Sequence, residues 1–459
     1  MRLILVSNRE PWICERSKKG VFYRKAIGGL VSSLDQAIKL RGGLWIAWGS
    51  GSDDFIQGDI APVPPDNPKY QLKRIKLSER EIERYYRGFS NGVLWPFFHI
   101  FLERVRFDRR LWEYYQKVNQ RFAKTVVEMM KPDDMVWVHD YHLALVPQFI
   151  REMREDARIA FFWHIPWVDW DVFNKLPWRR ELIRGLLGSD FIGFHTREYV
   201  TKFIRCAKKL GFSIVGKEII KQDNRKAKIG AFPLGIDNKI FKASIRDVNR
   251  LKKKINAEKI IIGVDRLDYT KGILQRLWAF ERFLEKYPKF RGKVSLVQIA
   301  SPSRTKVGEY RRMKRDIDEN VGRINGTFRR MDWTPVIYLY RTFPQSQLSV
   351  FYKAADVALV TPLMDGMNLV AKEYMAARED GVLILSEFAG AAEDLKEAII
   401  VNPYDIERVA DAIKDALELL PFEKNRRAKA LRKRIKKRDI NWWLNSFLYE
   451  WGEIYGIRI

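Results

Sequence analysis

Short runs of β-branched and aromatic residues alternate with helical stretches along the chain. In the first half, such runs predict four strands and a fifth that ends near Pro233; the four lie at Arg2–Ser7, Met135–His139, Arg158–His164 and Asp190–Phe194. The runs are continuously apolar, which is typical of strands that are covered on both faces. Strands that alternate with helices predict parallel sheets built from strand–helix units.

The same pattern restarts in the second half. It predicts strands at Lys259–Val264, Val294–Ile299, Val336–Tyr340, Asp356–Val360, Val382–Leu385 and Ala398–Val401. The segment between the two sets, Asn238–Glu258, is rich in Lys and Arg and has no strand signal, so we place an interdomain linker there. The pattern predicts an α/β protein with two doubly wound, Rossmann-like domains, residues 1–237 and 238–438.

Two such domains predict a cleft between the carboxyl ends of two facing sheets, because ligands bind at that edge of parallel sheets. The residues that directly follow each strand are therefore the first candidates for a functional site.

Length and composition agree with two globular domains. The chain has 459 residues, of which 46% are hydrophobic and 31% charged, and one core rarely spans that length. The two cysteines, Cys14 and Cys206, lie far apart, which argues against a disulfide framework and a thiolate metal site. The start of the chain lacks the features of a signal peptide, and no apolar run approaches the roughly 20 residues of a membrane-spanning helix. We therefore expect a cytoplasmic protein.

The net charge of +27 indicates anionic partners of some kind. Nucleic acid, phosphorylated metabolites and an anionic membrane surface are the alternatives, beside solvated helix faces of the kind common in thermophiles. The densest basic run, Lys424–Arg438, has helical character and no interleaved aromatic residues, which favours a solvated or partner-facing helix over a nucleic-acid site.

In the first half, candidate residues follow three of the predicted strands. Arg9 follows the first strand, and Gly28 and Gly29 open the next helical stretch, where backbone N–H groups can approach a phosphate, with a plain turn as the alternative. Asp140 follows His139, and its carboxylate suits the hydroxyls of a polyol. His164 ends the next strand, where a hydrogen-bonded structural histidine is the competing interpretation. A metal at the His-Asp-Tyr-His run is disfavoured, because the chain has five histidines and no further carboxylate clusters with it in sequence.

In the second half, two cations and two carboxylates stand out. Arg266 and Lys271 lie on either side of a turn that opens a helix, a suitable clamp for a diphosphate leaving group, although solvated surface charges are the alternative. Arg304 follows the next strand. Asp365 and Glu373 join a strand to a helix, so they can address different parts of one extended ligand, such as a sugar ring and a ribose.

These residues belong to longer motifs that follow one another in a fixed order: SNR, GGL, YYRGFSNGVLWP, VHDYHL, HIP, GFHT, PLGID, DRLDYTKG, GRINGTF, DGMNLVAKEY and FAGAAEDL. In identity and order they resemble the trehalose-6-phosphate synthase family, from about Leu3 to Pro403. The resemblance implies the GT-B fold, a retaining mechanism, no metal ion or other cofactor, and UDP- or GDP-glucose as the donor. It also implies a closing C-terminal helix, within residues 439–459, that packs back on the first domain.

Carried over position by position, the resemblance implies a donor site made of Gly29, Arg266, Lys271, Asp365, Asn368, Leu369, Val370 and Glu373. Arg266 and Lys271 would hold the diphosphate, and Glu373 would bind the ribose hydroxyls. Asp365 and His164 would hold hydroxyls of the transferred glucose. The residues in catalytic roles would be His164, Arg266, Lys271 and Asp365, with no carboxylate as a covalent nucleophile.

The acceptor site that the resemblance implies comprises Arg9, Trp48, Tyr86, Trp95, Asp140 and Arg304. The two arginines would grip the acceptor phosphate, and the other side chains would shape the sugar pocket. The expected acceptor is glucose 6-phosphate, which gives trehalose 6-phosphate.

The sequence departs from the family pattern at three places, and two of these affect the choice of acceptor. Met364 stands where the family has an arginine, and the segments Trp167–Trp170 and Trp45–Gly51 also differ. The last two are expected near the acceptor, so glycerol 3-phosphate, the acceptor of the related glucosylglycerol-phosphate synthases, stays an alternative.

Other classes of protein fit less well. A glycoside hydrolase needs two facing carboxylates roughly 5–10 Å apart, and nothing in the sequence pairs Asp365 with Asp140 in that way. A non-catalytic, nucleic-acid-binding or regulatory protein on the same scaffold would not need Arg266, Lys271, Asp365 and Glu373 intact. We expect small-molecule substrates, no nucleic-acid or membrane partner, and a homo-oligomer whose size the sequence does not reveal.

Overall fold

The computed structural model describes residues 1–17, 20–26, 29–51, 54–55, 58–216, 219–222, 225–303 and 308–457. The chain divides into two compact units. Unit 1 comprises Met1–Phe232 and Trp443–Ile459, and unit 2 comprises Pro233–Trp442. The boundaries therefore fall at Phe232 and Trp442, a few residues away from the expected positions at Asp237 and Arg438.

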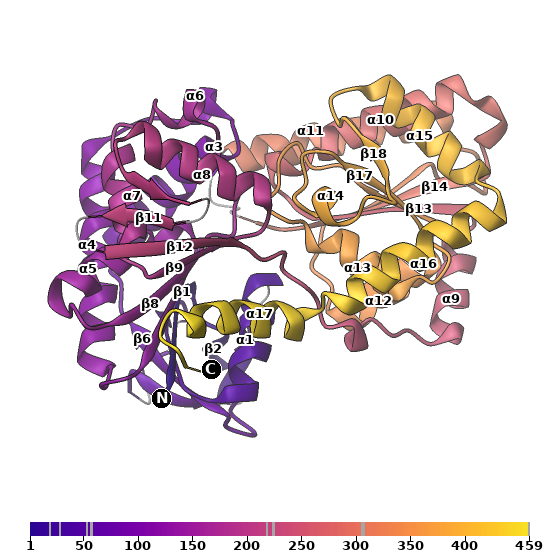
Figure 1. The fold of residues 1–459 in the computed structure, drawn as a ribbon. Coiled ribbons are helices and arrows are strands. Elements are labelled where there is room, and N and C mark those ends of the chain that lie inside the picture. Colours follow the sequence, from indigo (N-terminus) through magenta and orange to yellow (C-terminus); the bar gives the residue numbers. More distant parts are fainter. Residues whose placement is uncertain are drawn as a thin grey trace. The chain divides into compact units, whose positions relative to one another are not determined.

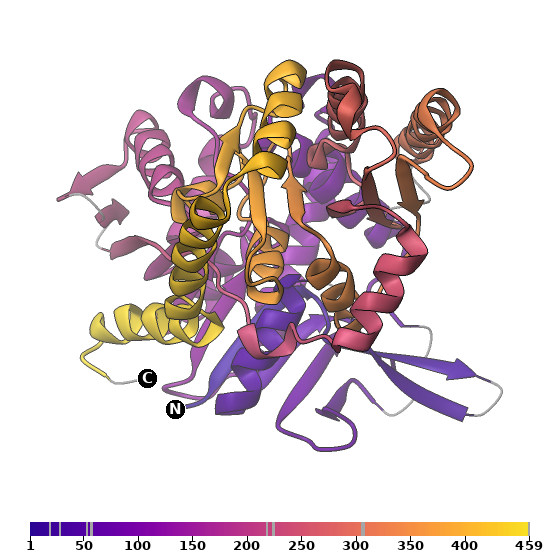
Figure 2. The same ribbon diagram turned by 90° about the vertical axis from the view of Figure 1, so that its right-hand side faces the viewer.

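Unit 1 contains a large sheet and a separate hairpin (Figures 1 and 2). Its strands are β1 (Leu3–Arg9), β2 (Trp12–Ser17), β3 (Gly20–Lys25), β4 (Leu44–Trp48), β5 (Ile60–Val63), β6 (Tyr70–Ile75), β7 (Met135–His139), β8 (Arg158–Phe162), β9 (Phe191–Phe194), β10 (Ser213–Val215), β11 (Ile219–Gln222) and β12 (Arg225–Ala231). Over the described residues, the large sheet has the order β10-β11-β12-β9-β8-β7-β1-β4-β6-β5, and β2 pairs with β3. The strands from β12 to β6 run parallel, and the strands at both edges are antiparallel.

The helices of unit 1 lie between single strands or groups of consecutive strands along the chain. They are α1 (Gly29–Arg41), α2 (Glu79–Glu81), the π-helix η1 (Ile82–Leu94), α3 (Trp95–Phe98), η2 (Leu102–Arg104), α4 (Arg109–Met129), η3 (Tyr141–Leu143), α5 (Val146–Met153), α6 (Trp170–Phe173), α7 (Arg179–Leu187) and α8 (Arg197–Lys209). The last long helix, α17 (Ile440–Glu453), returns from unit 2, and its part in unit 1 lies beside β8, β9 and β12 (Figure 1). Its Phe447 ring stacks 4.6 Å from Trp137 and lies 4.8 Å from Phe191.

Unit 2 is built on a parallel sheet. Its strands are β13 (Lys259–Arg266), β14 (Val294–Ser301), β15 (Val336–Leu339), β16 (Val357–Val360), β17 (Val382–Ser386) and β18 (Ile399–Val401). Over the described residues their order is β15-β14-β13-β16-β17-β18, with every pairing parallel. The chain starts in the middle of the sheet, builds one side and then crosses to build the other, which is the order of a dinucleotide-binding sheet.

The helices of unit 2 cover both faces of this sheet. They are η4 (Asn238–Ile240), α9 (Ile245–Ile255), η5 (Tyr269–Lys271), α10 (Ile273–Lys286), η6 (Pro288–Phe290), α11 (Gly308–Phe328), α12 (Gln345–Ala354), α13 (Leu369–Ala377), α14 (Ala391–Asp394), α15 (Ile406–Glu418) and α16 (Pro421–Lys437). One core cluster joins strands to α10, α11 and α15 through fully buried side chains such as Leu296, Phe280, Ile317 and Ile413.

The strands predicted from continuous apolar runs are all present, with ends that differ by at most a few residues. The apolar pattern did not predict β2, β3, β4, β5, β6, β10 and β11. In β5 and β6 buried and exposed positions alternate towards the sheet edge, so they lack the continuous run that marks a central strand. Strand β4 is different, because its run LWIAW is apolar and buried throughout, so it was missed although its sequence has the signal. The expected linker Asn238–Glu258 is also corrected, because it contains α9, which buries Val248 and Ile255 within unit 2.

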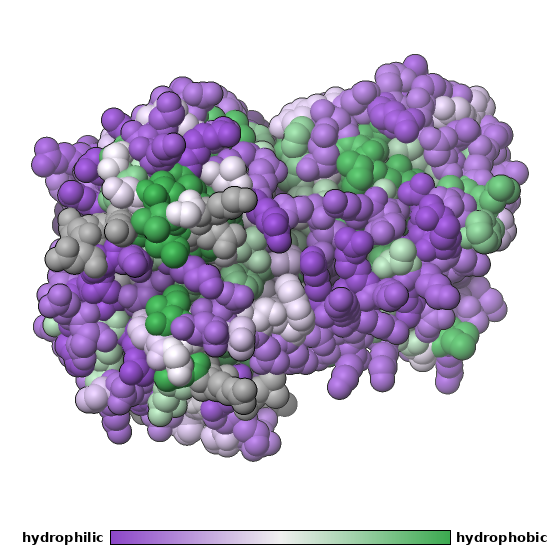
Figure 3. All heavy atoms as spheres, in the orientation of Figure 1, coloured by the Kyte–Doolittle hydropathy of each residue, from purple (hydrophilic) through white to green (hydrophobic). Residues whose placement is uncertain are grey.

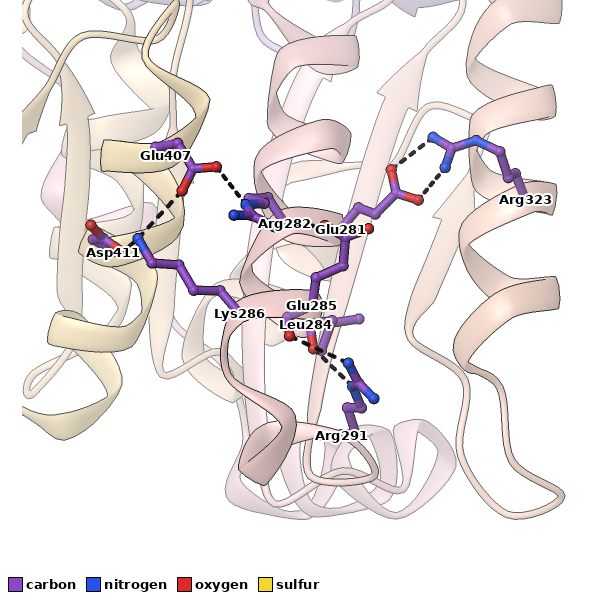
Figure 4. Close-up of polar contacts among 9 residues, drawn as sticks. All are labelled: Glu281, Arg282, Leu284, Glu285, Lys286, Arg291, Arg323, Glu407 and Asp411. Atoms are coloured by element: carbon purple, nitrogen blue, oxygen red, sulfur yellow. Dashed lines mark hydrogen bonds and ion pairs between the residues drawn. The ribbon is translucent and has the colours of Figure 1, made fainter.

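Charged side chains tie three helices of unit 2 together on the surface (Figure 4). Glu281 of α10 accepts two hydrogen bonds from Arg323 of α11, one of them at 2.7 Å. On the other side of α10, the Lys286 ammonium lies 2.6 Å from Asp411 and 3.3 Å from Glu407, both on α15. Such networks contribute more to stability than isolated surface pairs, and their share grows with temperature.

Among the described helices, none combines the length and the apolar character that crossing a lipid bilayer requires. The face drawn in Figure 3 is hydrophilic over most of its area, and its apolar side chains form separate small patches.

Candidate active site

The carboxyl ends of β13 and β16 bring the predicted donor residues of unit 2 together. These two strands are neighbours at the point where the strand order reverses, so their following loops diverge and leave a crevice. Lys271 comes from the loop after β13, and Asp365 comes from the loop after β16. The Lys271 ammonium lies 2.6 Å from Oδ2 of Asp365.

The loop that carries Lys271 is held by its own sequence. The buried Asp268 carboxylate accepts hydrogen bonds from the backbone N–H and the hydroxyl of Thr270, at 3.1 and 3.0 Å, which forms the short turn η5. Gly272 then adopts a φ of 64°, and a Cβ there would lie 2.4 Å from the Thr361 carbonyl oxygen. Only glycine therefore allows the loop to approach the β16 end and start α10 at once.

Beneath this loop lies a buried arginine that the sequence did not single out. Arg276 is 1% exposed and donates hydrogen bonds to Gln298 at 2.9 Å, to Thr361 at 3.1 Å and to the Lys271 carbonyl at 3.3 Å. It also pairs with Asp265. The network connects the ends of β13, β14 and β16, so the position of Lys271 is supported from below.

Arg266 differs from Lys271 in its exposure. Its side chain is 48% exposed, and its guanidinium lies 3.9 Å from Asp268, so it reaches solvent at the same sheet edge. Two cations at one strand end create a positive potential that suits a diphosphate.

The first turn of α13 provides the remaining donor candidates. Asn368 caps the helix with a φ of 69° and donates from Nδ2 to the Asp365 carboxylate at 3.1 Å. Leu369 and Val370 are the first two helical residues, and N–H groups in a first turn have no partner within the helix. One turn later, Glu373 accepts a 2.9 Å hydrogen bond from the Tyr352 hydroxyl. Burial raises the pKa of Glu373 above its ordinary value, and the Tyr352 hydrogen bond opposes that effect.

In unit 1 the strand order reverses at β1 and β7, and the predicted acceptor residues gather at this second crevice. Arg9 ends β1 and donates a 2.9 Å hydrogen bond to the Tyr86 hydroxyl. Its guanidinium lies 5.2 Å from the Trp48 ring and 4.9 Å from the Tyr86 ring. Tyr86 also stacks on His142 with ring centres 5.8 Å apart. The two rings hold the guanidinium through cation–π contacts, and a guanidinium is suited to bind phosphate oxygens.

Asp140 and Trp95 border the same group. Asp140 follows β7 with a φ of 73°, and its carboxylate accepts a 3.2 Å hydrogen bond from the His164 backbone N–H. Its other oxygen lies 3.9 Å from His142. Trp95 is farther from Arg9, since its ring contacts Tyr141 at 5.9 Å and Tyr141 in turn contacts His142.

Tyr86 lies on a π-helix, a conformation that the sequence did not predict. Asn91 holds this helix to the crevice, because its Nδ2 donates to the Tyr86 carbonyl at 2.8 Å and its Oδ1 accepts from the Tyr141 hydroxyl at 2.9 Å. π-Helical turns are rare and are frequently found at functional sites. The motif YYRGFSNGVLWP was visible in the sequence, but the role of Asn91 depends on its partner 50 residues away.

His164 forms a hydrogen-bonded pair with His139, 3.0 Å apart from Nε2 to Nδ1. Burial lowers the pKa of both side chains well below the ordinary value, and the neighbouring histidines lower that of His164 further, so both rings are neutral. Nε2 of His139 is buried without a partner among the described residues. A proton on Nδ1 of His139 leaves an N–H at Nδ1 of His164, whereas a proton on Nε2 of His164 leaves an N–H at Nε2 of His139. Either arrangement leaves one buried N–H and one buried acceptor without a partner among the described residues.

Residues 1–452 match the model of glycosyltransferase family 20. The chain belongs to this family. A bifunctional trehalose-6-phosphate synthase/phosphatase of Thermoproteus tenax is 41% identical over 98% of the chain, and the chain spans 63% of that relative's length.

Two solved structures resemble the chain over almost all of both lengths. A structure from E. coli, described as bound with UDP-2-fluoro glucose, is 36% identical with a TM-score of 0.89 and covers 98% of this chain and 99% of its own. An α,α-trehalose-phosphate synthase (UDP-forming) from Burkholderia xenovorans in complex with glucose-6-phosphate is 35% identical with a TM-score of 0.89 and covers 98% and 100%. The GT-B fold that the sequence predicted is confirmed.

Gly28 and Arg304 lie outside the described residues, and Gly29 is placed only as the first residue of α1. The predicted roles of all the site residues stay predictions. Of the described His, Cys, Asp and Glu side chains, no three are grouped as a metal ion would need.

Proposed function

We propose that this chain is a retaining glucosyltransferase that transfers glucose from UDP-glucose to glucose 6-phosphate, with trehalose 6-phosphate and UDP as products. The observation that carries the proposal is the Lys271–Asp365 pair at the reversal point of the unit 2 sheet. It places a cation suited to a diphosphate and a carboxylate suited to sugar hydroxyls within one hydrogen bond of each other. The ligands named for the E. coli and Burkholderia structures support the choice of donor and acceptor.

On the donor side, Arg266 and Lys271 bind the diphosphate. Lys271 exchanges its contact with Asp365 for a phosphate oxygen, which leaves the Asp365 carboxylate to accept hydrogen bonds from glucose hydroxyls. The backbone at Asn368–Val370 lines the donor site, and Glu373 accepts hydrogen bonds from the ribose. His164 holds a hydroxyl of the transferred glucose through its Nδ1, which has no partner among the described residues.

On the acceptor side, Arg9 binds the phosphate. The rings of Trp48 and Tyr86 flank its guanidinium and restrict its motion, so little conformational freedom is lost when the phosphate binds. Asp140 accepts hydrogen bonds from the acceptor sugar, and Trp95 closes the far side of the pocket.

The reaction proceeds on one face of the donor sugar. The bond between the anomeric carbon and the diphosphate oxygen breaks, and the acceptor hydroxyl oxygen bonds to that carbon from the same side. The acceptor proton passes to the departing phosphate oxygen. Arg266 and Lys271 lower the barrier because they stabilise the charge that develops on the leaving group, and no metal ion is required.

Glycerol 3-phosphate is a second candidate acceptor because of the unusual segments noted in the sequence. The structure weakens the argument from the segment Trp167–Trp170. Trp167 and Val168 are each 1% exposed, and the Trp167 ring packs against Phe98 at 5.0 Å and Phe203 at 4.8 Å. These two residues therefore belong to the core of unit 1 and do not face a ligand.

A product assay without added metal tests the proposal. UDP- and GDP-glucose are each offered with glucose 6-phosphate, with glycerol 3-phosphate, or without an acceptor. Trehalose 6-phosphate with an α,α linkage is the expected product. Glucosylglycerol phosphate would move the acceptor to the second candidate, and no transfer to either acceptor would contradict the proposed reaction.

Replacing Arg9 with Ala should affect the binding of the acceptor and leave that of the nucleotide sugar unchanged. Without the guanidinium, the KM for the phosphorylated acceptor should rise about 10- to 100-fold, while the KM for the nucleotide sugar stays within about twofold. Arg16→Ala is the matched control, because Arg16 lies on the hairpin of the same unit. An unchanged acceptor KM in Arg9→Ala would show that the acceptor phosphate binds elsewhere.

A further inference from the structure

We propose that Tyr352 is a positioning residue of the donor site, whose hydroxyl holds the Glu373 carboxylate ready for the ribose hydroxyls of the nucleotide. The inference rests on the proposed function, because it assigns a supporting residue to the proposed ribose ligand. Tyr352 lies on α12 and Glu373 on α13, so the contact joins two helices that the sequence motifs do not link.

The Tyr352 ring is itself fixed. It is fully buried, and its centre lies 6.4 Å from the ring of Phe241 and 6.4 Å from that of Tyr374, the latter edge-on at 79°. A ring packed from two sides has one orientation, so its hydroxyl oxygen has a defined place. From there it donates to Oε2 of Glu373 at 2.9 Å.

The proton in this hydrogen bond belongs to the tyrosine. Burial and the charge of Glu373 raise the pKa of Tyr352 well above its ordinary value, so it stays a donor at any physiological pH. A carboxylate has about four lone-pair positions and Tyr352 uses one of them. Two vicinal hydroxyls can therefore still donate to Glu373, which no longer samples its other rotamers.

No cation competes for this carboxylate over the described residues. Tyr352 is the one side chain there that hydrogen-bonds Glu373. The adjacent Lys372 points elsewhere, to the Leu234 carbonyl at 2.8 Å and Asp394 at 3.3 Å. Asp265 on β13 acts electrostatically on Tyr352. The tyrosine hydroxyl is thus the group that both orients Glu373 and favours its ionised form.

Tyr374 provides a matched control. It is as fully buried as Tyr352, lies beside it, and donates its hydroxyl to the Ala355 carbonyl at 3.3 Å, away from Glu373. Tyr352→Phe and Tyr374→Phe each remove one buried hydroxyl from the same packing region. A merely structural effect should therefore appear in both variants.

The experiment is calorimetric titration of the full chain with UDP, together with donor kinetics. Tyr352→Phe should weaken UDP binding about 5- to 10-fold and raise the donor KM by a similar factor with little change in kcat. Tyr374→Phe should stay within about twofold of the unmodified chain. In a Glu373→Gln background, Tyr352→Phe should have little further effect, because the carboxylate that it orients is gone.

The pH dependence provides a readout that a structural role would not move. UDP should bind best when Glu373 is ionised, and loss of the Tyr352 hydrogen bond raises the pKa of Glu373. The acidic limb of UDP affinity should therefore move to higher pH in Tyr352→Phe and stay in place in Tyr374→Phe.

The outcomes separate this inference from the proposed function. If the unmodified chain binds UDP and Tyr352→Phe binds it equally well with the same acidic limb, the positioning role is wrong. Equal losses in both tyrosine variants would also overturn it. If the unmodified chain binds neither UDP nor GDP, the proposed function itself fails and the inference with it.

Discussion

At the level of single residues, Lys271 and Asp365 show how two predicted ligands of one substrate can hold each other in place. Both side chains are mostly buried, at 10% and 15% exposure, and they lie 2.6 Å apart. An ammonium in this position is neutralised by the carboxylate, and in the proposed reaction a diphosphate takes the place of that carboxylate. The pair therefore keeps a cation inside the crevice without leaving a buried charge uncompensated.

Lys271→Ala should lower kcat by about 100- to 1,000-fold, because the lysine stabilises charge that develops on the leaving group in the transition state. Steady-state kinetics with saturating substrates measures the effect. Lys289→Ala is the control: this lysine of unit 2 is 62% exposed and pairs with Glu418 on the surface, so its removal should leave kcat unchanged. A kcat near that of the unmodified chain in Lys271→Ala would exclude this lysine from the clamp.

Glu10 follows Arg9 in the chain and has a raised pKa, but its contacts support the fold. Glu10 is buried, accepts hydrogen bonds from Arg74 at 2.8 Å and from the Ser50 backbone at 2.6 Å, and shares Arg74 with the buried Asp54. Burial and the neighbouring Asp54 raise the pKa of Glu10 to about 7. The folded chain therefore retains a proton on Glu10 that the unfolded chain releases above its ordinary pKa of 4.5.

The sign of the pH dependence follows from this difference. The contribution of Glu10 is fully present below pH 4.5 and is lost as the pH rises through about 7. Glu10→Gln cannot lose this contribution, because glutamine does not titrate. Between about pH 5 and about pH 8 the unmodified chain should therefore lose about 2–3 kcal/mol of unfolding free energy more than the variant does. Urea unfolding at both pH values measures it. Glu103→Gln, at a side chain that is 67% exposed, should show no such change; an equal change in both variants would contradict the assignment to Glu10.

At the level of helices and strands, α17 shows how the end of the chain completes unit 1. Trp443, Phe447 and Trp451 are fully buried on one side of this helix, and Phe447 contacts rings from β7, β8, β9 and the residue after β12. Gly193 allows this approach, since a Cβ there would lie 2.6 Å from the Phe447 ring. The helix therefore covers strands that would otherwise expose aromatic side chains to water.

Phe447→Ala should lower the free energy of unfolding by about 3–5 kcal/mol, because a fully buried ring is lost and its cavity is lined by other rings that cannot all move in. Tyr449→Ala is the matched control on the same helix, since Tyr449 is 59% exposed, and we expect a change of less than about 0.5 kcal/mol. Thermal unfolding of both variants measures the difference. Similar stability in the two would mean that α17 does not close the core of unit 1.

At the level of the whole molecule, the positive charge is the most unusual property. The chain has 84 Lys and Arg against 57 Asp and Glu, and the face in Figure 3 is largely hydrophilic. Many of these charges are paired locally, as between α10, α11 and α15, so they support stability without specifying a ligand. The excess that remains attracts the two anionic substrates of the proposed reaction to the molecule. A homo-oligomer stays a prediction.

Raising the ionic strength from about 0.02 M to about 0.3 M should lower kcat/KM for the phosphorylated acceptor about 3- to 10-fold, because salt screens the attraction beyond the Debye length. The kcat should change less than about twofold, since the bound substrates are partly shielded from salt. Initial rates in two different salts measure the effect and separate screening from the binding of a particular ion. A kcat/KM independent of ionic strength would show that the excess charge serves another purpose.

Continuous apolar runs were enough to predict the central strands of both sheets except β4, because a strand covered on both faces is apolar along its whole length. The loops that hold Arg9, Lys271 and Asp365 were predicted because parallel strands bring their carboxyl ends to one edge. The GT-B fold was implied by the resemblance of the ordered motifs to a known family. Edge strands such as β5 and the helix α9 escaped this reasoning, because their burial depends on neighbours that are distant in sequence.

The apolar runs and motifs did not predict which polar side chains contact one another. Lys271 meets Asp365 across 94 residues, Asn91 meets Tyr141 across 50, and His139 meets His164 across 25. Tyr352 showed no signal at all in the sequence, since a buried tyrosine in a helix resembles any other core residue until its hydroxyl is seen beside Glu373. Local sequence specifies which residues can form strands, helices and turns, whereas the pairing of polar groups depends on the packing of whole elements, which sets distances to within a hydrogen bond.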